Sequence, residues 1–115
     1  MNQPDTHRSR VSTETQTDEE KRTRRIPPYN VILLNDDHHS QVFVIEVLGK
    51  VLGCSTERAY QLMMEAHTSG RAIIWTGTRE VAELKAEQIQ TYPEIRDDGA
   101  KLGPLGCDIE PAPGA

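Results

Sequence analysis

The sequence predicts a single α+β domain in which three helices pack against a small three-stranded antiparallel sheet, in the order β-α-α-β-α-β. Two observations lead to this prediction. Three apolar runs of five or six residues are too short for helices, whereas three longer segments have apolar residues that recur every three or four positions. Each longer segment also begins after a Ser or Thr and ends at a Gly or Pro, as helices commonly do.

The residues before this domain have a different composition. Residues 1–28 contain one Met, one Val and one Ile as their only aliphatic residues, with six basic and five acidic side chains. Such a segment buries too little apolar area to offset the entropy lost on ordering, so we expect a disordered N-terminal extension. Two consecutive prolines then favour an extended entry into the domain. We expect the domain to cover residues 29–110, followed by a flexible C-terminal tail at 111–115.

The first predicted strand is followed directly by the first predicted helix. Residues 29–34 are rich in Val, Ile and Leu and are too short for a helix, which indicates a buried strand. Ser40 can cap the helix that follows, and Gly53 can end it. The apolar residues of this helix form one broad inward face, which consists of Phe43, Val44, Val47, Leu48, Val51 and Leu52.

A second helix and a second strand come next. Ser55 offers another cap, Glu57 is favourable in the first turn, and Gly70 ends the helix. We expect the two helices to pack back to back, and residues 71–75 to form a short strand. The apolar stripe of the second helix consists of Ala59, Leu62, Met63 and Ala66.

The third predicted helix begins after Thr78 and ends at Pro93. Its sequence is amphipathic, and residues 105–109 can supply the last strand of the sheet. We expect Val81, Ala82, Leu84, Ile89 and Tyr92 to point inward, and Glu80, Glu83, Lys85 and Glu87 to point largely outward.

The charge and the cysteines narrow the class of protein. The net charge is −5, and the residues from 29 onward contain seven Lys and Arg against thirteen Asp and Glu, which argues against a nucleic-acid partner. Cys54 and Cys107 match no zinc spacing, so we expect free thiols in a reducing compartment, with a structural disulfide as the alternative. No apolar stretch is long enough for a membrane helix, and we expect a cytoplasmic protein with no membrane partner.

The sequence lacks the signatures of catalysis and of cofactor binding. His67 is the one plausible general base, neither cysteine has an activating neighbourhood, and the glycines stand singly instead of forming a phosphate loop. We therefore expect no enzymatic activity and no cofactor.

Metal binding is a competing interpretation of the polar residues. No H-x-x-x-H or H-E-x-x-H pattern places two histidines on one helix face as metal ligands. We expect no native metal site, although incidental nickel or zinc binding is compatible with this composition. The residues concerned are Asp36, Asp37, His38, His39 and His67.

The tripeptide Asn35-Asp36-Asp37 at the end of the first strand suits recognition of an amine. An ammonium group has three donors and needs two or three acceptors at fixed angles. The carbonyl of Asn35, an Asp carboxylate and an unprotonated nitrogen of His67 supply such acceptors if the two segments meet, and this ties binding to pH. The alternative is that Asn35 and Asp36 only shape the turn or cap the next helix, with Asp37 in solvent.

Several separate motifs of this sequence resemble the ClpS adaptor family. The first motif reads YNVILLNDD at residues 29–37, and the others follow in order and with the family's spacing. Together they cover nearly all of residues 28–110, which makes the resemblance specific. The other matching segments are residues 43–48, 57–59, 61–64, 66–67, 70–73 and 80–85.

The resemblance implies an adaptor with no catalytic activity. ClpS-like proteins bind substrates that carry an N-terminal Phe, Tyr, Trp or Leu and pass them to a Clp AAA+ unfoldase for degradation by its partner peptidase. Carried over to this chain, Asn35, Asp36 and His67 hold the α-amino group of the substrate, and Asp37 supports the entrance. The hydrophobic pocket is then implied to be lined by Leu33, His39, Gln41, Val44, Met63, Ala66 and Leu105.

The resemblance also implies where the unfoldase binds. Glu80 and Lys85 match family positions that contact its N-terminal domain, and the N-terminal extension matches a segment that the unfoldase engages during delivery.

Since the sequence has no long exposed heptad, we expect a monomer.

Three pocket residues depart from the family pattern. His39 and Gln41 stand where a small hydroxyl residue and a Met are common, and Ala66 stands where a larger aliphatic residue is common. We expect a reshaped rim and one enlarged wall. The alternative function is a ClpS-like regulator of the unfoldase with altered or no recognition of N-terminal residues.

Overall fold

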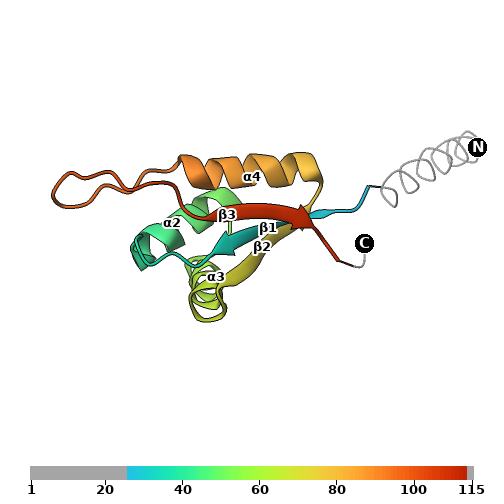
Figure 1. Cartoon of the computed structure of the whole chain (residues 1–115). Helices are drawn as coiled ribbons and strands as arrows, with labels where there is room; N and C mark the ends of the chain where they lie inside the picture. The colour runs from blue at the N-terminus through green and yellow to red at the C-terminus, as the bar shows by residue number, and fades with distance from the viewer. Residues whose placement is uncertain (1–25, 114–115) are drawn as a thin grey trace, which may run out of the picture.

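The computed structural model describes residues 26–113 and shows three helices packed against a three-stranded sheet (Figure 1). The predicted α+β class and element order are confirmed. The predicted disordered extension lies almost wholly outside the described residues, as do the last two residues of the predicted C-terminal tail. The elements are β1 (Tyr29–Leu34), α2 (Gln41–Leu52), α3 (Thr56–Ser69), β2 (Arg71–Gly77), α4 (Arg79–Thr91) and β3 (Cys107–Pro111).

β1 is the central strand of the sheet. It pairs antiparallel with β2 on one side and with β3 on the other, so the strand order is β2-β1-β3. A β-bulge shifts the register between Val31 and Ile32 and leaves Ile74 of β2 without a directly opposite residue. Because both edges of β1 are paired, its position is fixed by the whole sheet.

The predicted helix ends are confirmed by their capping contacts. The side chains of Ser40, Ser55 and Thr78 each accept a hydrogen bond from the backbone N–H three residues further on. Gly53 and Gly70 end α2 and α3 with φ of 68° and 92°, in the left-handed region that a side chain disfavours.

One face of the sheet carries the hydrophobic core. Val31 and Leu33 of β1 belong to the same buried cluster as side chains from all three helices. The inward faces predicted for α2 and α3 supply most of it. The buried helical residues are Val44, Val47, Leu48 and Val51 of α2, Ala59, Leu62, Met63 and Ala66 of α3, and Ala82 and Ile89 of α4.

The side chains of β1 that alternate with the core residues are buried as well. Ile32 is 1% exposed and Asn30 is 3% exposed. The side-chain carbonyl of Asn30 accepts a hydrogen bond from the hydroxyl of Thr76 at 2.6 Å, which offsets the cost of burying the amide. This bond also ties β1 to β2 through side chains.

The predicted inward face of α4 is wrong at two positions. Ala82 and Ile89 are buried as expected and Tyr92 is half-buried, but Val81 and Leu84 are 38% and 53% exposed. At 3.6 residues per turn, Leu84 lies about 200° around the helix from Ala82, so the helix cannot bury both against one surface. The number of apolar residues in α4 exceeds what one packed face accommodates.

The side chain of Lys85 also differs from the prediction that it points largely outward. Its ammonium group donates a hydrogen bond to the carbonyl of Val51 at 3.1 Å and lies 5.6 Å from the centre of the Trp75 ring. The long aliphatic stem lets the charge reach back over the edge of the core. The glutamates predicted to face solvent on this helix are exposed.

The last strand begins and ends later than predicted. The strand expected at residues 105–109 is observed at Cys107–Pro111, and Leu105 lies in the loop before it. The register places Cys107 opposite the end of β1, so residue 105 has no strand to pair with. Since Pro111 still pairs with β1, strand structure continues past residue 110, where we expected the domain to end.

Replacing Ile89 by Ala tests the observed orientation of α4. The truncation opens a cavity in the core and should lower the free energy of unfolding by about 2–5 kcal/mol. The matched change Leu84→Ala, on the exposed side of the same helix, should lower it by less than about 0.5 kcal/mol. Urea unfolding followed by circular dichroism measures both values, and equal losses would contradict the orientation.

Candidate functional site

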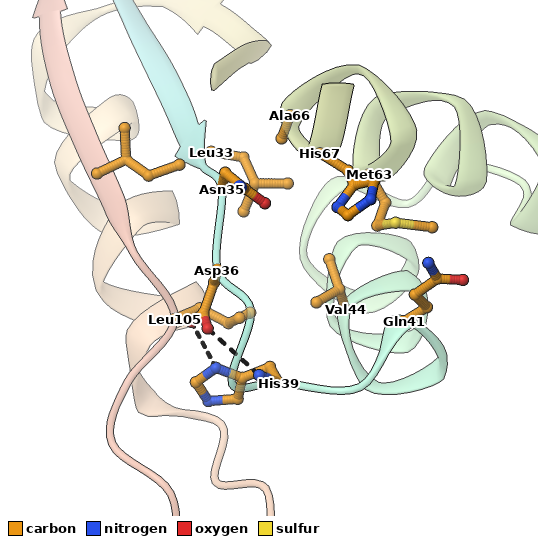
Figure 2. Close-up of a pocket in the computed structure, with 11 residues that line it drawn as sticks. Leu33, Asn35, Asp36, His39, Gln41, Val44, Met63, Ala66, His67 and Leu105 are labelled. Atoms are coloured by element: carbon orange, nitrogen blue, oxygen red, sulfur yellow. Dashed lines mark hydrogen bonds and ion pairs between the residues drawn. The ribbon is translucent and has the colours of Figure 1, made fainter. Parts of the chain in front are cut away.

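A small pocket opens where four segments of the chain meet (Figure 2). They are the end of β1 with the loop after it, the start of α2, the C-terminal half of α3, and the loop before β3. The cavity volume is about 40 Å³, well below the roughly 300–1,000 Å³ of pockets that enclose whole ligands. The lining residues are Leu33, Leu34, Asn35, Asp36, His39, Gln41, Val44, Met63, Ala66, His67 and Leu105.

Backbone hydrogen bonds hold the end of β1 at this pocket from both sides. The N–H of Leu34 donates to the carbonyl of Gly106 at 3.0 Å, and the N–H of Asn35 donates to the carbonyl of Gly70 at 2.9 Å. Gly70 is the residue that ends α3, so this bond brings the last turn of α3 beside Asn35. The side chains of Asn35 and His67 therefore face each other across the gap between β1 and α3 (Figure 2).

Asp36 is bonded within the loop that it begins. Its Oδ1 accepts the backbone N–H of His38 at 2.7 Å and that of His39 at 3.2 Å, and its Oδ2 lies 2.5 Å from Nδ1 of His39. Burial raises the pKa of this carboxyl, but the hydrogen bonds and the charge of His39 outweigh burial and hold the pKa below its usual value. Asp36 is thus ionised at neutral pH, and it is turned toward His39 (Figure 2).

His39 joins this loop to the loop between α4 and β3. Its side chain is 3% exposed, its Nε2 lies 2.8 Å from the carbonyl oxygen of Gly103, and its ring stacks on Phe43 with centroids 5.4 Å apart. The neighbouring Ser40 N–H donates to the carboxylate of Glu94 at 3.0 Å. The start of α2 is therefore tied to that loop at two points.

The pocket is apolar at its base and polar at its mouth. Its most buried side chains are aliphatic or carry a thioether, whereas its exposed side chains are amides and an imidazole. The first group comprises Leu33, Val44, Met63, Ala66 and Leu105, and the second comprises Asn35, Gln41 and His67. The arrangement suits a ligand with an apolar body and a hydrogen-bonding end.

The structure brings all but one of the predicted pocket residues together. Three of the four residues predicted to hold an amine and all seven predicted for the hydrophobic pocket line this cavity. Asp37 is exposed and does not line it. Leu34 lines the cavity without having been predicted, because strand alternation places its side chain on the face opposite that of Leu33.

Other chemistry has no comparable site among residues 26–113. In this part of the chain no three His, Cys, Asp or Glu side chains gather as metal ligands do, and no helix has the length and apolar character that a bilayer span requires.

Cys54 and Cys107 are free thiols, as predicted. Burial, with the charge of Asp108, raises the pKa of Cys107 to about 11, so this thiol stays protonated at neutral pH.

The two residues predicted to bind a partner lie away from the pocket. Glu80 is exposed in the first turn of α4, and Lys85 follows on the same helix. The guanidinium of the adjacent Arg79 lies 5.5 Å from the ring centre of Tyr29, the first residue of β1. The start of α4 is therefore near the beginning of β1 (Figure 1), whereas the residues that line the pocket include those at the end of β1.

The chain is similar to known proteins over most of its length. The family described as ATP-dependent Clp protease adaptor protein ClpS matches residues 24–107. Two proteins named ATP-dependent Clp protease adapter protein ClpS, from Salmonella arizonae and Vibrio cholerae, are 43% identical over 88 residues and 40% identical over 96 residues. These matches cover 75% and 82% of this chain, and 78% and 86% of the two relatives.

The fold is also similar to that of a solved structure. This is the structure of Agrobacterium tumefaciens ClpS2 bound to L-phenylalaninamide, with a TM-score of 0.63 and 34% sequence identity. The similarity covers 75% of this chain and 98% of that one.

Replacing Asp36 by Asn tests whether its carboxylate stabilises the loop at the pocket. Since its folded pKa is lowered, Asp36 contributes stability above the pKa of an unfolded aspartate, and this contribution is lost as the pH falls through the folded pKa. The variant should be roughly 1–2 kcal/mol less stable at neutral pH. It should also lose less stability than the wild type on acidification.

Urea unfolding at a series of pH values measures this difference. The matched variant Asp37→Asn changes an exposed neighbouring carboxylate and should alter the stability at neutral pH by less than about 0.5 kcal/mol. Stability profiles of the wild type and Asp36→Asn that run parallel down to acid pH would contradict the role assigned to Asp36.

Proposed function

Because the chain belongs to the family of the ATP-dependent Clp protease adaptor protein ClpS, we propose that it binds proteins with a bulky hydrophobic N-terminal residue and delivers them to a Clp AAA+ unfoldase and its peptidase. The N-terminal residues are Phe, Tyr, Trp and Leu. The observation that carries this proposal is the pocket, which is aliphatic at its base and has Asn35 and His67 at its mouth. An N-terminal residue matches this pocket, because its ammonium group and its side chain are both bonded to the α-carbon.

Asn35 and His67 are the residues that we assign to direct contact with the α-ammonium group of the substrate. The side-chain carbonyl of Asn35 and an unprotonated nitrogen of His67 accept hydrogen bonds, and the two side chains face each other across the mouth. Asp36 adds negative charge at this end of the pocket, and we assign the exposed Asp37 to the entrance. Acylation removes the charge of the amine and leaves only one of its three N–H donors, so recognition requires a free N-terminus.

The first side chain of the substrate enters the apolar base. Burial of a large apolar side chain contributes roughly 1.5–3 kcal/mol. The lining of the cavity includes side chains that can adjust to the side chain of the substrate. Met63 and Gln41 are unbranched and change rotamer readily. The small side chain of Ala66 leaves extra room at one wall of the pocket, which favours a bulky side chain on the substrate.

Glu80 and Lys85 are the residues that we assign to contact with the N-terminal domain of the unfoldase. Glu80 lies at the end of α4 that is near the beginning of β1, and Lys85 contacts Val51 at the end of α2. Neither residue lines the pocket, so the unfoldase and a bound N-terminal residue do not compete for one surface. Lys85 reaches the partner only if its ammonium group leaves the carbonyl of Val51. Glu80 is exposed and needs no such change.

We further propose that the protein acts as a monomer in the cytoplasm and catalyses no reaction itself. The relatives named as adaptors of the Clp protease support the last point. The Cys107 thiol, which is buried and protonated at neutral pH, is no nucleophile.

A regulator of the unfoldase that does not recognise N-terminal residues is the second candidate. The pairing of Asp36 with His39 favours it, because Oδ2 of Asp36 already contacts Nδ1 of His39 and is less available to an ammonium group. The small volume of the cavity favours it as well. Peptide binding separates the two candidates.

A labelled peptide that begins with Phe should bind the full chain, and its N-acetylated twin should bind at least about tenfold more weakly, because acetylation removes the charged donor. His67→Ala should cause a loss of similar size without unfolding the protein, since His67 is exposed. The matched control His38→Ala changes an exposed histidine that does not line the pocket and should bind as the wild type does. Fluorescence anisotropy measures all four affinities.

Two results would decide against this assignment. Equal binding of the free and acetylated peptides, or wild-type binding by His67→Ala, would remove the proposed amine site. If no peptide beginning with Phe, Tyr, Trp or Leu binds while the protein still binds the Clp unfoldase, the regulator becomes the better account.

Glu80→Ala should slow the degradation of a fluorescent substrate with an N-terminal Phe by about two- to fivefold, because a charge at the edge of an interface mainly affects association. Peptide binding should be unchanged. The control Glu87→Ala, an exposed glutamate further along α4, should leave both readouts unchanged. Degradation by the purified unfoldase and peptidase measures delivery, and a wild-type rate with Glu80→Ala would place the unfoldase contact elsewhere.

A further inference from the structure

Both ring nitrogens of His39 face hydrogen-bond acceptors. Nδ1 lies 2.5 Å from Oδ2 of Asp36, and Nε2 lies 2.8 Å from the carbonyl oxygen of Gly103. The carboxylate of Asp36 is ionised at neutral pH and can only accept, and a backbone carbonyl can only accept as well. Each nitrogen can form a hydrogen bond to its acceptor only by donating, so both bonds exist together only in the imidazolium form of the ring.

This bridge joins two sides of the pocket. The residues that Nε2 connects, His39 and Gly103, are 64 positions apart in the sequence. Gly103 comes two residues before Leu105, which is 1% exposed and forms part of the apolar base, and Asp36 follows Asn35 at the mouth. The side chain of His39 is thus one of the ties that set the spacing between the amine-binding mouth and the Leu105 wall, together with the Leu34–Gly106 backbone hydrogen bond.

The surroundings of His39 suit a fixed, charged ring. Its side chain is 3% exposed, and the ring lies against Phe43 with an interplanar angle of 20°. A buried charge is costly unless it is paired, and the two acceptors pair this one. The charged and titratable groups placed around it are Asp36 in its own loop, Glu94 from the segment after α4, and His67 of α3 across the pocket.

We propose that His39, as an imidazolium ion, is a positioning residue for recognition of the substrate's N-terminal residue, because it bridges Asp36 and Gly103 and sets the spacing of the pocket. This inference rests on the proposed function. The contribution of His39 is present while both nitrogens carry protons, so it is lost as the pH rises. His67 has the opposite requirement, because it accepts a hydrogen bond only when it is unprotonated, so affinity falls at both ends of the pH range.

The variant His39→Gln tests the proposal, because glutamine carries no charge and has both N–H donors on one nitrogen, whereas the imidazolium ring donates from two separate nitrogens. The affinity for a labelled peptide beginning with Phe is measured by fluorescence anisotropy from about pH 5.5 to about pH 8.5, the range in which imidazoles titrate. At each pH, the ratio of the Kd of the variant to that of the wild type cancels the titration of the peptide amine and of His67. We expect a ratio of about ten at the acid end that falls toward about two at the alkaline end.

The matched control is His38→Gln, which removes an exposed imidazole from the same loop. Its side chain does not line the pocket, so its Kd should equal that of the wild type at every pH. If the wild type binds no peptide with a free N-terminus at any pH, the proposed function is overturned. Three other outcomes overturn only the role of His39.

Those three outcomes concern the ratio for His39→Gln. A ratio of one at every pH would show that the bridge does not affect binding. A ratio above one that does not change with pH would show a packing role without the charge. Tighter binding by the variant would show that His39 competes with the substrate for Asp36.

Nuclear magnetic resonance of the full chain tests the bridge without a peptide, and it serves equally if His39→Gln does not fold. Long-range proton–nitrogen spectra report whether each imidazole nitrogen carries a proton. We expect both nitrogens of His39 to be protonated at the acid end, and the backbone amides of Gly103 and Leu105 to shift with the same midpoint as the ring. A neutral ring throughout the series, or amides that do not follow it, would overturn the proposal.

Discussion

The two backbone hydrogen bonds at the end of β1 are the constraint on which the site depends. Through them Leu34 and Asn35 are held between the loop before β3 and the last turn of α3. Both acceptors are glycine carbonyls. Gly70 has a φ of 92°, and a Cβ added at Gly106 would lie 3.2 Å from Cβ of Leu34, so neither position accommodates a side chain without strain or displacement. The central strand thus ends at a fixed point, with the polar residues just beyond it.

The chemistry of the pocket follows from where the chain leaves the sheet. Residues before the end of β1 are buried in the core, and those after it are close to solvent, so an aliphatic base and a polar mouth adjoin each other. Asp36 contacts His39 within the turn, which leaves Asn35 and His67 as the polar side chains that face the opening. In the proposed function, an N-terminal residue occupies both parts of the pocket at once.

Local patterns in the sequence predicted much of this structure, because helix caps and the spacing of apolar residues are local properties. The three caps and the inward faces of α2 and α3 are examples. The sequence patterns did not predict properties that depend on distant residues. The pairing register with β1 starts the last strand at Cys107 and leaves Leu105 in the loop, and the packing of α4 leaves Leu84 exposed. The resemblance to a family named ten of the eleven lining residues, but the contact of His39 with Gly103 spans 64 residues and has no sequence signal.

The central claim is that this pocket holds a free α-ammonium group together with an apolar side chain. Its most direct test is a titration of the labelled full chain with L-phenylalaninamide, followed by proton–nitrogen and methyl spectra, with N-acetyl-L-phenylalaninamide as the control. The account predicts saturable shifts of the Asn35 side-chain amide, the His67 ring and the methyl groups of Ala66 and Leu105, with little response to the acetylated compound. Shifts that fall elsewhere, or that are equal for both compounds, would contradict it.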